Sequence, residues 1–504
     1  MIPVPEIDWF ALAPELALTA AALLVMLTEL FLSGERKRLV NPVAFIGVLV
    51  SLGFVIALAV DGADRQAFGN MFVVDGYALL FKVFFLAVAA FVLLVSYRYI
   101  GEIPTYQGEY YFLMLTSFVG MLLMASARDL VMLFVALELV SVPGFVMAGL
   151  RKFDLRSNEG ALKFFLIGVL SVAVLLFGLS IVYGFTGTTD LAGVAAALAV
   201  APREPLLLAS LLFVITGFAF KVSAVPFHFW APDTYEGAPV PVTAFLSVAS
   251  KAAGFVGLMQ ICFIAFAPLA DVWAPVLGIL AVLTMTFGNL VALQQRNIVR
   301  LFAYSSIAHA GYMLVPFGVF RAGDAGVNQQ AMSGVLMYLI AYALMNIGAF
   351  AVITAVARRH PGRQVADYAG LGQRAPALAM AMTMFLLSLG GIPPLVGLWA
   401  KFFIFTAAVN AGSAFGYFLA GAVVINSVIA MFYYLAVART MWMDAPAEES
   451  TLRSGKSLGF AVAALAVLAL LGGIYPQPFR NAAESSTFNP DTGENFAVEL
   501  SVAP

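Results

Sequence analysis

The sequence predicts an all-α polytopic membrane protein of about fourteen transmembrane helices, with two inverted five-helix repeats that each contain a broken helix. Three observations support this prediction. Of the 504 residues, 62% are hydrophobic and 11% are charged, whereas soluble proteins contain about 25% charged residues. Apolar runs of about 20 residues, the length that crosses a bilayer as a helix, recur along the whole chain. A short motif near residue 128 returns 168 residues later.

The predicted spans follow from the apolar runs and from the charged or turn-forming residues that separate them. The loops between them are short, so no soluble domain is expected. The polar tail from Asn481 to Pro504 is predicted to be loosely attached. The spans are 9–32, 39–60, 76–97, 109–127, 129–150, 159–185, 205–229, 240–268, 273–294, 297–320, 330–357, 376–409, 414–439 and 457–475.

The distribution of basic residues predicts the orientation of these spans. With the N-terminus outside, the cytoplasmic loops carry 16 of the 26 Lys and Arg residues and the outer segments carry 5. Basic loops remain in the cytoplasm, so we expect a multi-pass protein of the inner (cytoplasmic) membrane with both termini outside. The remaining five basic residues, 26 − 16 − 5, are lysines within spans: Lys82, Lys163, Lys221, Lys251 and Lys401.

Lysine is an expensive residue inside hydrocarbon. A central lysine costs roughly 2.5–3.5 kcal/mol, so four of them cost on the order of 10 kcal/mol. Such residues persist when they are neutral, paired or in contact with internal water. Arginine keeps its charge, whereas lysine can lose its proton when it is desolvated. The use of lysine alone therefore favours a proton path through the spans.

An internal repeat is visible in the sequence. Residues 128–134 (RDLVMLF) resemble residues 296–302 (RNIVRLF), and the same offset of 168 carries Pro226 onto Pro394. Five spans separate the copies, and because five is odd, the second copy is inverted. Inverted repeats with broken helices are typical of transporters, whose ion sites lie near the breaks. The predicted segments are an N-terminal three-helix segment (1–108), a first repeat (109–268), a second repeat (269–440), and a C-terminal helix with its polar tail (441–504).

Two helix breaks are predicted from proline and glycine. Pro226 interrupts the seventh span and residues 390–394 (GGIPP) interrupt the twelfth, because proline removes a backbone donor and clashes with the preceding turn. The freed carbonyl groups need partners, for which water in a cavity is suitable. Lys221 lies just before the first break, and Lys401 follows the second. Both are candidate proton carriers. The alternatives are that Lys221 only plugs the freed carbonyl groups and that Lys401 extends to the membrane surface.

Two further titratable residues lie deep in the predicted spans. Glu138 is the one acid deep in a span, and we expect it to pair with Lys221; a static stabilising pair is the alternative. Lys251 is flanked by small residues, which suit close helix packing. We therefore expect Lys251 to point into the bundle.

Three other residues are weaker candidates for proton transfer. Lys163 lies nearer the cytoplasmic end of its span, where extension to the surface is an equal alternative. His228 follows the first break and His309 lies in the repeated span. A histidine titrates near neutral pH and can relay protons, but each is equally well explained as a hydrogen-bonded core residue.

The composition argues against several other classes of function. The single cysteine, Cys262, excludes an intrachain disulfide and a cysteine-ligated cluster, and only three histidines are available for a haem or metal centre. We therefore expect no cofactor in this chain. The net charge of −2 indicates no nucleic-acid partner.

Two runs of residues resemble a known family. Residues 226–245 (PFHFWAPDTYEGAPVPVTAF) and residues 390–401 (GGIPPLVGLWAK) resemble the antiporter-like membrane subunits of proton-pumping NADH:quinone oxidoreductase, respiratory complex I. The resemblance covers nearly the whole chain and implies fourteen spans with inverted five-helix repeats. The same family includes cation/proton antiporter subunits and membrane-bound hydrogenase subunits.

The resemblance implies a role for each main candidate. Glu138 would pair with Lys221 of the broken seventh span and act as a switch. Lys251 would be the central relay, and Lys401 would serve the outward half-channel. Lys163 and His228 would occupy supporting positions.

The resemblance also implies partners. Protons would move from the cytoplasm to the outside, driven by redox chemistry in other subunits, so this chain would be a translocase subunit without a redox centre. FMN, iron–sulfur clusters and quinone would be held by those partner subunits. The direct neighbours would be an adjacent antiporter-like subunit, small membrane subunits and membrane lipids.

Two alternative functions remain open from the sequence. One is a subunit of a stand-alone cation/proton antiporter or of a membrane-bound hydrogenase, which belongs to the same family. The other is a structural membrane spacer whose lysines only hold the packing together.

Overall fold

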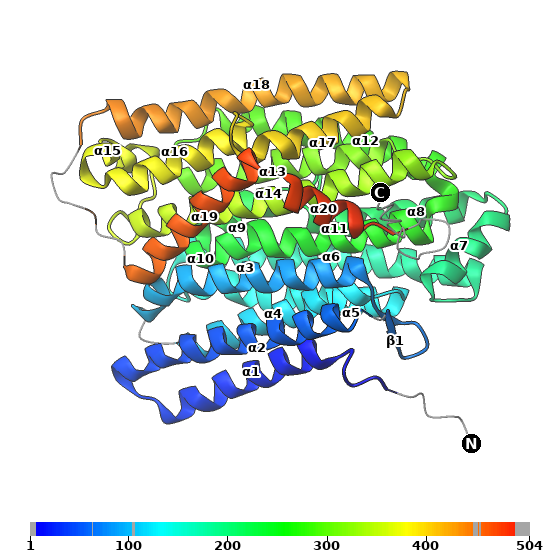
Figure 1. Cartoon of the computed structure of the whole chain (residues 1–504), viewed down its shortest axis with the longest axis horizontal. Coiled ribbons are helices and arrows are strands. Elements are labelled where there is room, and N and C mark those ends of the chain that lie inside the picture. The colour runs from blue at the N-terminus through cyan, green and yellow to red at the C-terminus, as the bar shows by residue number, and fades with distance from the viewer. Residues whose placement is uncertain (1–6, 63, 103–105, 447–451, 453–454, 489–504) are drawn as a thin grey trace, which may run out of the picture.

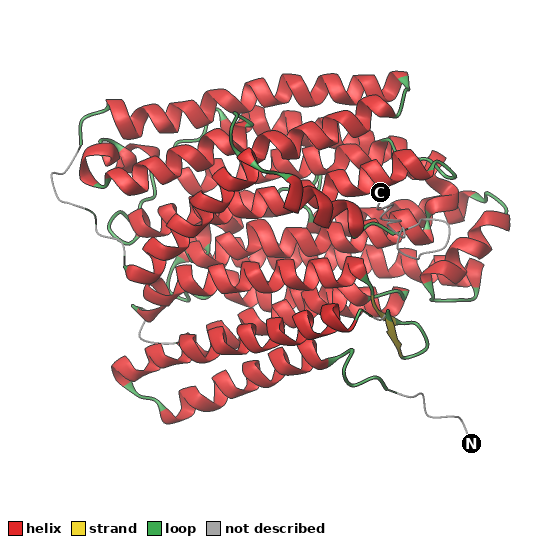
Figure 2. Ribbon diagram, viewed as in Figure 1, coloured by secondary structure: helices red, strands yellow, loops and turns green. Residues whose placement is uncertain are grey.

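The computed structural model describes residues 7–62, 64–102, 106–446, 452 and 455–488. Most of its helices run side by side along one common direction (Figure 1). Within these residues the strands form a single antiparallel hairpin, β1 (Arg65–Ala67) with β2 (Phe72–Val74) (Figure 2). The all-α fold class is therefore confirmed.

The helices follow the order of the chain. Short 3-10 helices cover Gly34–Leu39, Ala267–Leu269 and Val365–Tyr368, and π-helical segments cover Leu246–Ser250 and Ile261–Ala265. The α-helices are α1 (Ala13–Phe31), α2 (Val40–Asp61), α3 (Gly76–Gly101), α4 (Gln107–Ser126), α5 (Leu130–Ala148), α6 (Leu155–Thr186), α7 (Leu191–Val200), α8 (Pro205–Lys221), α9 (Trp230–Gly237), α10 (Val240–Phe245), α11 (Lys251–Gln260), α12 (Ala270–Ala292), α13 (Ile298–Gly318), α14 (Ala325–Ala357), α15 (Leu371–Arg374), α16 (Pro376–Gly390), α17 (Val396–Asn410), α18 (Ala414–Met443), α19 (Lys456–Ile474) and α20 (Gln477–Ser485).

The number of membrane crossings agrees with the predicted fourteen. Twelve helical stretches are long and apolar enough to span a membrane. Two further crossings are each made of two shorter helices, α8 with α9 and α16 with α17, which gives 12 + 2 = 14. Both predicted breaks are present, because α8 ends five residues before Pro226 and α17 begins two residues after Pro394.

The two repeats are built alike at the start of α5 and α13. The side chain of Asp129 accepts hydrogen bonds from two backbone N–H groups in the first turn of α5, and Asn297 does the same for α13. Each capping residue also bridges a later loop, Asp129 to Asp190 and Asn297 to Gln364. Successive crossings alternate in direction, so the second copy is inverted, as predicted.

The interior of the bundle is formed by α10–α11, α13 and α14. Almost every side chain in these helices is buried, whereas α1, α2, α6 and α18 expose many large apolar side chains. A bilayer would cover these outer helices, because lipid tails are as apolar as the side chains themselves. Lys251, at the start of α11, therefore lies in the middle of the protein and points inward, as predicted.

The C-terminal segment corrects one prediction. The tail from residue 481 was expected to be loose, but residues 481–485 complete α20, and Phe488 is buried with its ring 5.1 Å from that of Tyr77. The prediction was wrong for the part of the tail that the structure describes. A short amphipathic helix such as α20 has a low mean hydropathy, so apolar runs alone do not reveal it.

The shared capping of α5 and α13 leads to a first prediction. We expect Asp129→Ala and Asn297→Ala each to lower the free energy of unfolding by about 1 kcal/mol, because each removes the acceptor for two helix-end N–H groups. Unfolding in mixed detergent micelles measures this change. Ser180→Ala, at an exposed hydroxyl of α6, is the control and should have no effect. A loss in only one of the two cap variants would contradict their equivalence.

Candidate functional site

Lys221 is the last residue of α8, immediately before the first break. Its side chain is buried, and Nζ donates a hydrogen bond of 2.8 Å to Ser141 Oγ of α5. Glu138 lies one helical turn before Ser141, and its buried Oε1 has no hydrogen-bond partner among the described residues. The direct ion pair predicted between Glu138 and Lys221 is therefore not formed. Ser141 occupies the ammonium group instead, although the two charges lie close enough to interact.

The first break leaves few of its polar groups unpaired. The carbonyl oxygen of Phe220 accepts a hydrogen bond of 3.1 Å from Trp230 Nε1, and the N–H of Val225 donates to Thr284 of α12 at 3.0 Å. His228 is buried against the ring of Phe287, and its Nδ1 has no partner among the described residues. No hydrogen bond between described residues joins His228 to the lysines.

Lys251 makes the central contact between the two repeats. Its Nζ donates to the carbonyl oxygen of Ser306 at 2.6 Å and to Ser306 Oγ at 2.7 Å, both on α13. One turn further along α11, Gly254 leaves room for Lys221, because a Cβ at this position would lie 2.8 Å from Lys221 Cγ. The side chain of Lys221 therefore reaches the helix that carries Lys251.

His309 lies between the central and the final lysine. Its Nδ1 is 2.7 Å from the hydroxyl of Tyr338, and its Nε2 is 3.1 Å from the hydroxyl of Tyr434. The Tyr434 hydroxyl is in turn 2.5 Å from Ser305 Oγ. The ring is buried and lies close enough to Lys251 and Lys401 for the charges to interact.

Lys401 closes the second break. It lies on α17, and Nζ donates a hydrogen bond of 2.9 Å to the carbonyl oxygen of Gly390, the last residue of α16. The ammonium also lies 5.0 Å from the ring centre of Tyr312. The side chain is buried, so the alternative that Lys401 extends to the membrane surface is not what the structure shows.

Lys163 belongs to a different group of charges. Its side chain is 42% exposed and lies 2.6 Å from both Glu159 and Asp233. Arg300 continues the network, with contacts of 2.7 Å to Asp233 and 2.9 Å to Glu236. This cluster joins α6, α9 and α13 at the end of the bundle where α6 begins. The structure therefore places Lys163 outside the buried series of lysines.

Lys82, which the sequence singled out only as a span residue, forms a buried ion pair. Its Nζ lies 2.8 Å from Glu15 Oε1, and both side chains are at most 5% exposed. The ring of Phe72 lies 4.6 Å from the same ammonium group. The pair joins α1 to α3 and is separate from the other buried lysines.

Sequence reasoning missed the groups that partner these lysines. Hydroxyl residues are common in membrane helices, so no signal distinguished those that accept from a lysine or a histidine. The acids of α9 were visible in the run 226–245, but their role depended on contacts with other helices. The missed residues are Ser141, Ser305, Ser306, Tyr338, Tyr434, Asp233, Glu236 and Arg300.

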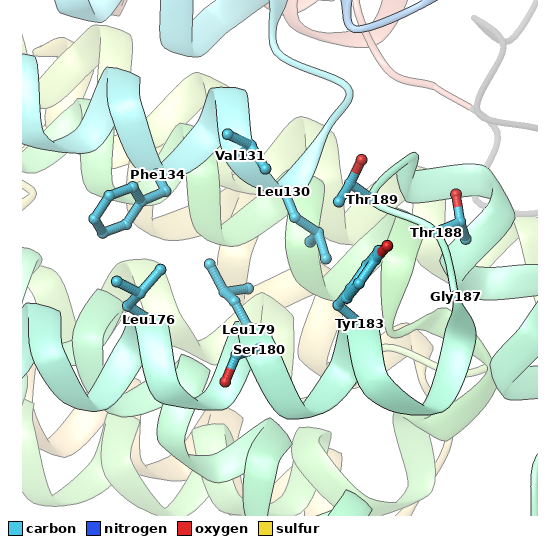
Figure 3. Close-up of a pocket in the computed structure, with 10 residues that line it drawn as sticks. All are labelled: Leu130, Val131, Phe134, Leu176, Leu179, Ser180, Tyr183, Gly187, Thr188 and Thr189. Atoms are coloured by element: carbon cyan, nitrogen blue, oxygen red, sulfur yellow. The ribbon is translucent and has the colours of Figure 1, made fainter.

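The largest cavity lies away from these groups, between α5 and α6. It has a volume of about 570 Å³ and is lined by residues such as Val131, Phe134, Leu179 and Tyr183 (Figure 3). No acid, lysine, histidine or cysteine lines it. Among the described residues, no cluster of three or more His, Cys, Asp or Glu side chains is placed to hold a metal ion. The buried lysines remain the candidate site.

Comparison with known proteins gives a consistent family. Residues 127–430 match the family described as NADH:quinone oxidoreductase/Mrp antiporter, TM. The chain is 42% identical to NADH-quinone oxidoreductase subunit N of Trichlorobacter lovleyi, over 86% of this chain and 88% of the relative.

Solved structures with the same fold include two membrane complexes. A chain of respiratory complex I from Thermus thermophilus, solved with bound aureothin, has a TM-score of 0.77 and 30% identity, and the match covers 93% of this chain and 99% of that one. A chain of the Mrp complex from a Dietzia species has a TM-score of 0.81 over 96% of this chain and 98% of that one. At 19% identity, the second likeness concerns the fold alone.

The buried pair of Lys82 and Glu15 leads to a second prediction. We expect Lys82→Met to lower the free energy of unfolding by about 3–5 kcal/mol, because it leaves a carboxylate buried without its partner. Changing both residues, with Glu15→Leu added, should recover most of this loss. Unfolding in detergent micelles compares the single and the double variant. Equal losses in both would show that packing, not charge, explains the effect.

Proposed function

This chain belongs to the NADH:quinone oxidoreductase/Mrp antiporter family of transmembrane subunits, and from that premise we propose that it is subunit N of a proton-translocating NADH:quinone oxidoreductase. Its role is to carry protons from the cytoplasm to the outside of the inner membrane. The redox reaction takes place in partner subunits, which hold FMN, iron–sulfur clusters and quinone. The proposed neighbours are an adjacent antiporter-like subunit and small membrane subunits.

One observation carries the proposal: the buried titratable groups form a connected series across the middle of the bundle. Lys221 packs against Gly254 on the helix of Lys251, and Lys251 donates to Ser306 of α13. His309 follows Ser306 by one turn, and its charge interacts with that of Lys401. Such groups, placed next to helix breaks, are typical of ion pathways in membrane proteins.

We propose that Lys221 alternates between two acceptors. In the structure it donates to Ser141, and Glu138 has a buried oxygen without a partner one turn away. Side chains three residues apart on a helix are neighbours, so a change of rotamer moves the ammonium from one to the other. Pairing with the carboxylate retains the proton on Lys221, whereas desolvation without that pairing favours its release.

The proton then moves along α13. From Lys221 it reaches Lys251, and from there the hydroxyl of Ser306 and the ring of His309 lead toward Lys401. Tyr338 and Tyr434 hold the two ring nitrogens of His309, so a proton gained at one nitrogen is matched by one lost at the other. Lys401 delivers the proton to the outer side.

The energy for this transport comes from outside the chain. Moving one charge against the membrane potential costs about 2.3 kcal/mol per 100 mV. Glu138 offers a route for coupling, because it lies on the same side of α5 as Val131, Val135 and Val142, each about half exposed. An adjacent subunit packed on this side would lie next to the proposed switch.

The central position of Lys251 leads to a third prediction. We expect Lys251→Met to lower the number of protons pumped per NADH oxidised at least about tenfold, which corresponds to a barrier higher by about 1.4 kcal/mol. Lys456→Met, at an exposed lysine that begins α19, is the matched control and should pump normally. Proton uptake by inverted vesicles that contain the assembled complex measures both. Normal pumping by Lys251→Met would contradict the proposal and favour a structural spacer.

The contact between Tyr434 and His309 leads to a fourth prediction. We expect Tyr434→Phe to slow pumping about two- to tenfold, the rate equivalent of one hydrogen bond of about 0.5–1.5 kcal/mol. Tyr417→Phe, on the exposed side of the same helix, should leave the rate unchanged. Pumping rates and thermal stability are compared for both variants. If pumping by Tyr434→Phe falls only as far as stability does, the hydroxyl has no part in the path.

A further inference from the structure

The last crossing of the chain is also interrupted, at the level of the second break. α19 ends at Ile474 and α20 begins at Gln477, after Pro476, and α20 continues from α19 toward the side on which the N-terminus lies (Figure 1). Gly473 touches the second break itself, because a Cβ at 473 would overlap the carbonyl oxygen of Pro394. Trp399 Nε1 donates to the carbonyl oxygen of Gly473 at 2.8 Å and holds the two breaks together.

The helix α20 separates two cavities of different character. Phe479 and Ala482 line an apolar cavity of about 270 Å³, together with side chains of α3, α14 and α19. The polar side of α20 carries Gln477, Arg480 and Glu484 and lines a second cavity of about 320 Å³ with α14 and α17. We call this second cavity the α20 cavity.

The walls of the α20 cavity are polar. Asn410 of α17 donates to Gln330 of α14 at 2.8 Å, and Arg480 lies 2.8 Å from Glu484. The cavity extends from Asn410, at the end of α17, to Trp399, eleven residues earlier, a distance of about 16 Å along the helix. A charged pair and several amides at this depth require contact with water, because hydrocarbon leaves such groups unsolvated.

The inner end of the α20 cavity lies next to the group that would receive the transported proton. Trp399 and Pro476 line this end, and the loop 391–395 lies beside them. On the other side of the same loop, Lys401 donates to the carbonyl oxygen of Gly390 and packs against Gly391. A single loop therefore separates Lys401 from the α20 cavity.

We propose that the α20 cavity is a water-filled vestibule through which protons released by Lys401 leave toward the N-terminal side of the membrane. Its ligand is water, and Arg480 with Glu484 lines the way out. The direction of transport rests on the proposed function, whereas the presence of water in the vestibule does not. Access of water is therefore tested separately from pumping.

Thiol labelling tests this inference in the assembled complex within membrane vesicles. Cys262, the only native cysteine, is buried and gives a low background. The test variant is Ser333→Cys, whose native side chain is buried and lines the α20 cavity; Gln477→Cys is a second test variant. Ala482→Cys, which faces the apolar cavity from the same helix, is the control. A negatively charged methanethiosulfonate is added on the N-terminal side.

We expect both test variants to react at least about tenfold faster than the control, because the reaction needs a thiolate, which forms in water. We also expect the attached group to slow pumping. Slow labelling by the charged reagent, together with fast labelling by an apolar maleimide, would show a groove filled by lipid and overturn the vestibule. Fast labelling with unchanged pumping would overturn its role as the exit, while leaving the path through Lys251 to its own test.

Discussion

An ammonium group inside a membrane needs an oxygen atom as acceptor, and this requirement organises the bundle. Lys221 uses the hydroxyl of Ser141, Lys251 uses the carbonyl and hydroxyl of Ser306, and Lys401 uses the carbonyl of Gly390. An unbroken helix occupies its own carbonyl groups, so free acceptors come from hydroxyl side chains or from helix ends. The second helix break thus provides the oxygen that lets Lys401 remain in the interior.

The inverted repeat explains where these acceptors lie. The offset of 168 residues that relates Asp129 to Asn297 also carries Glu138 onto Ser306 and Ser141 onto His309. The positions of α5 that face Lys221 therefore correspond to those of α13 that bear the acceptor of Lys251 and the histidine. The first copy has an acid where the second has a neutral hydroxyl. A charge-controlled step in the first copy and a neutral relay in the second are consistent with this difference.

Much of this arrangement was predictable, because hydrocarbon imposes a simple rule on sequence. Apolar runs indicated the spans, Pro226 and the glycine–proline run at 390–394 indicated both breaks, and the absence of arginine from the spans pointed to the lysines. The partners were less predictable. The expected contact between Glu138 and Lys221 was wrong in detail, because a serine one turn away competes for the same ammonium.

The sequence by itself determined that the chain crosses the membrane many times, where two crossings break and which residues bear costly charges, since these follow from composition along a single helix. The tertiary structure alone decided which lysines belong together. Lys163 and Lys82 look similar to Lys251 in sequence, but one lies in an exposed charge cluster and the other in a separate buried pair. Such partners come from helices far apart in the chain, and local pattern contains no record of which helices meet.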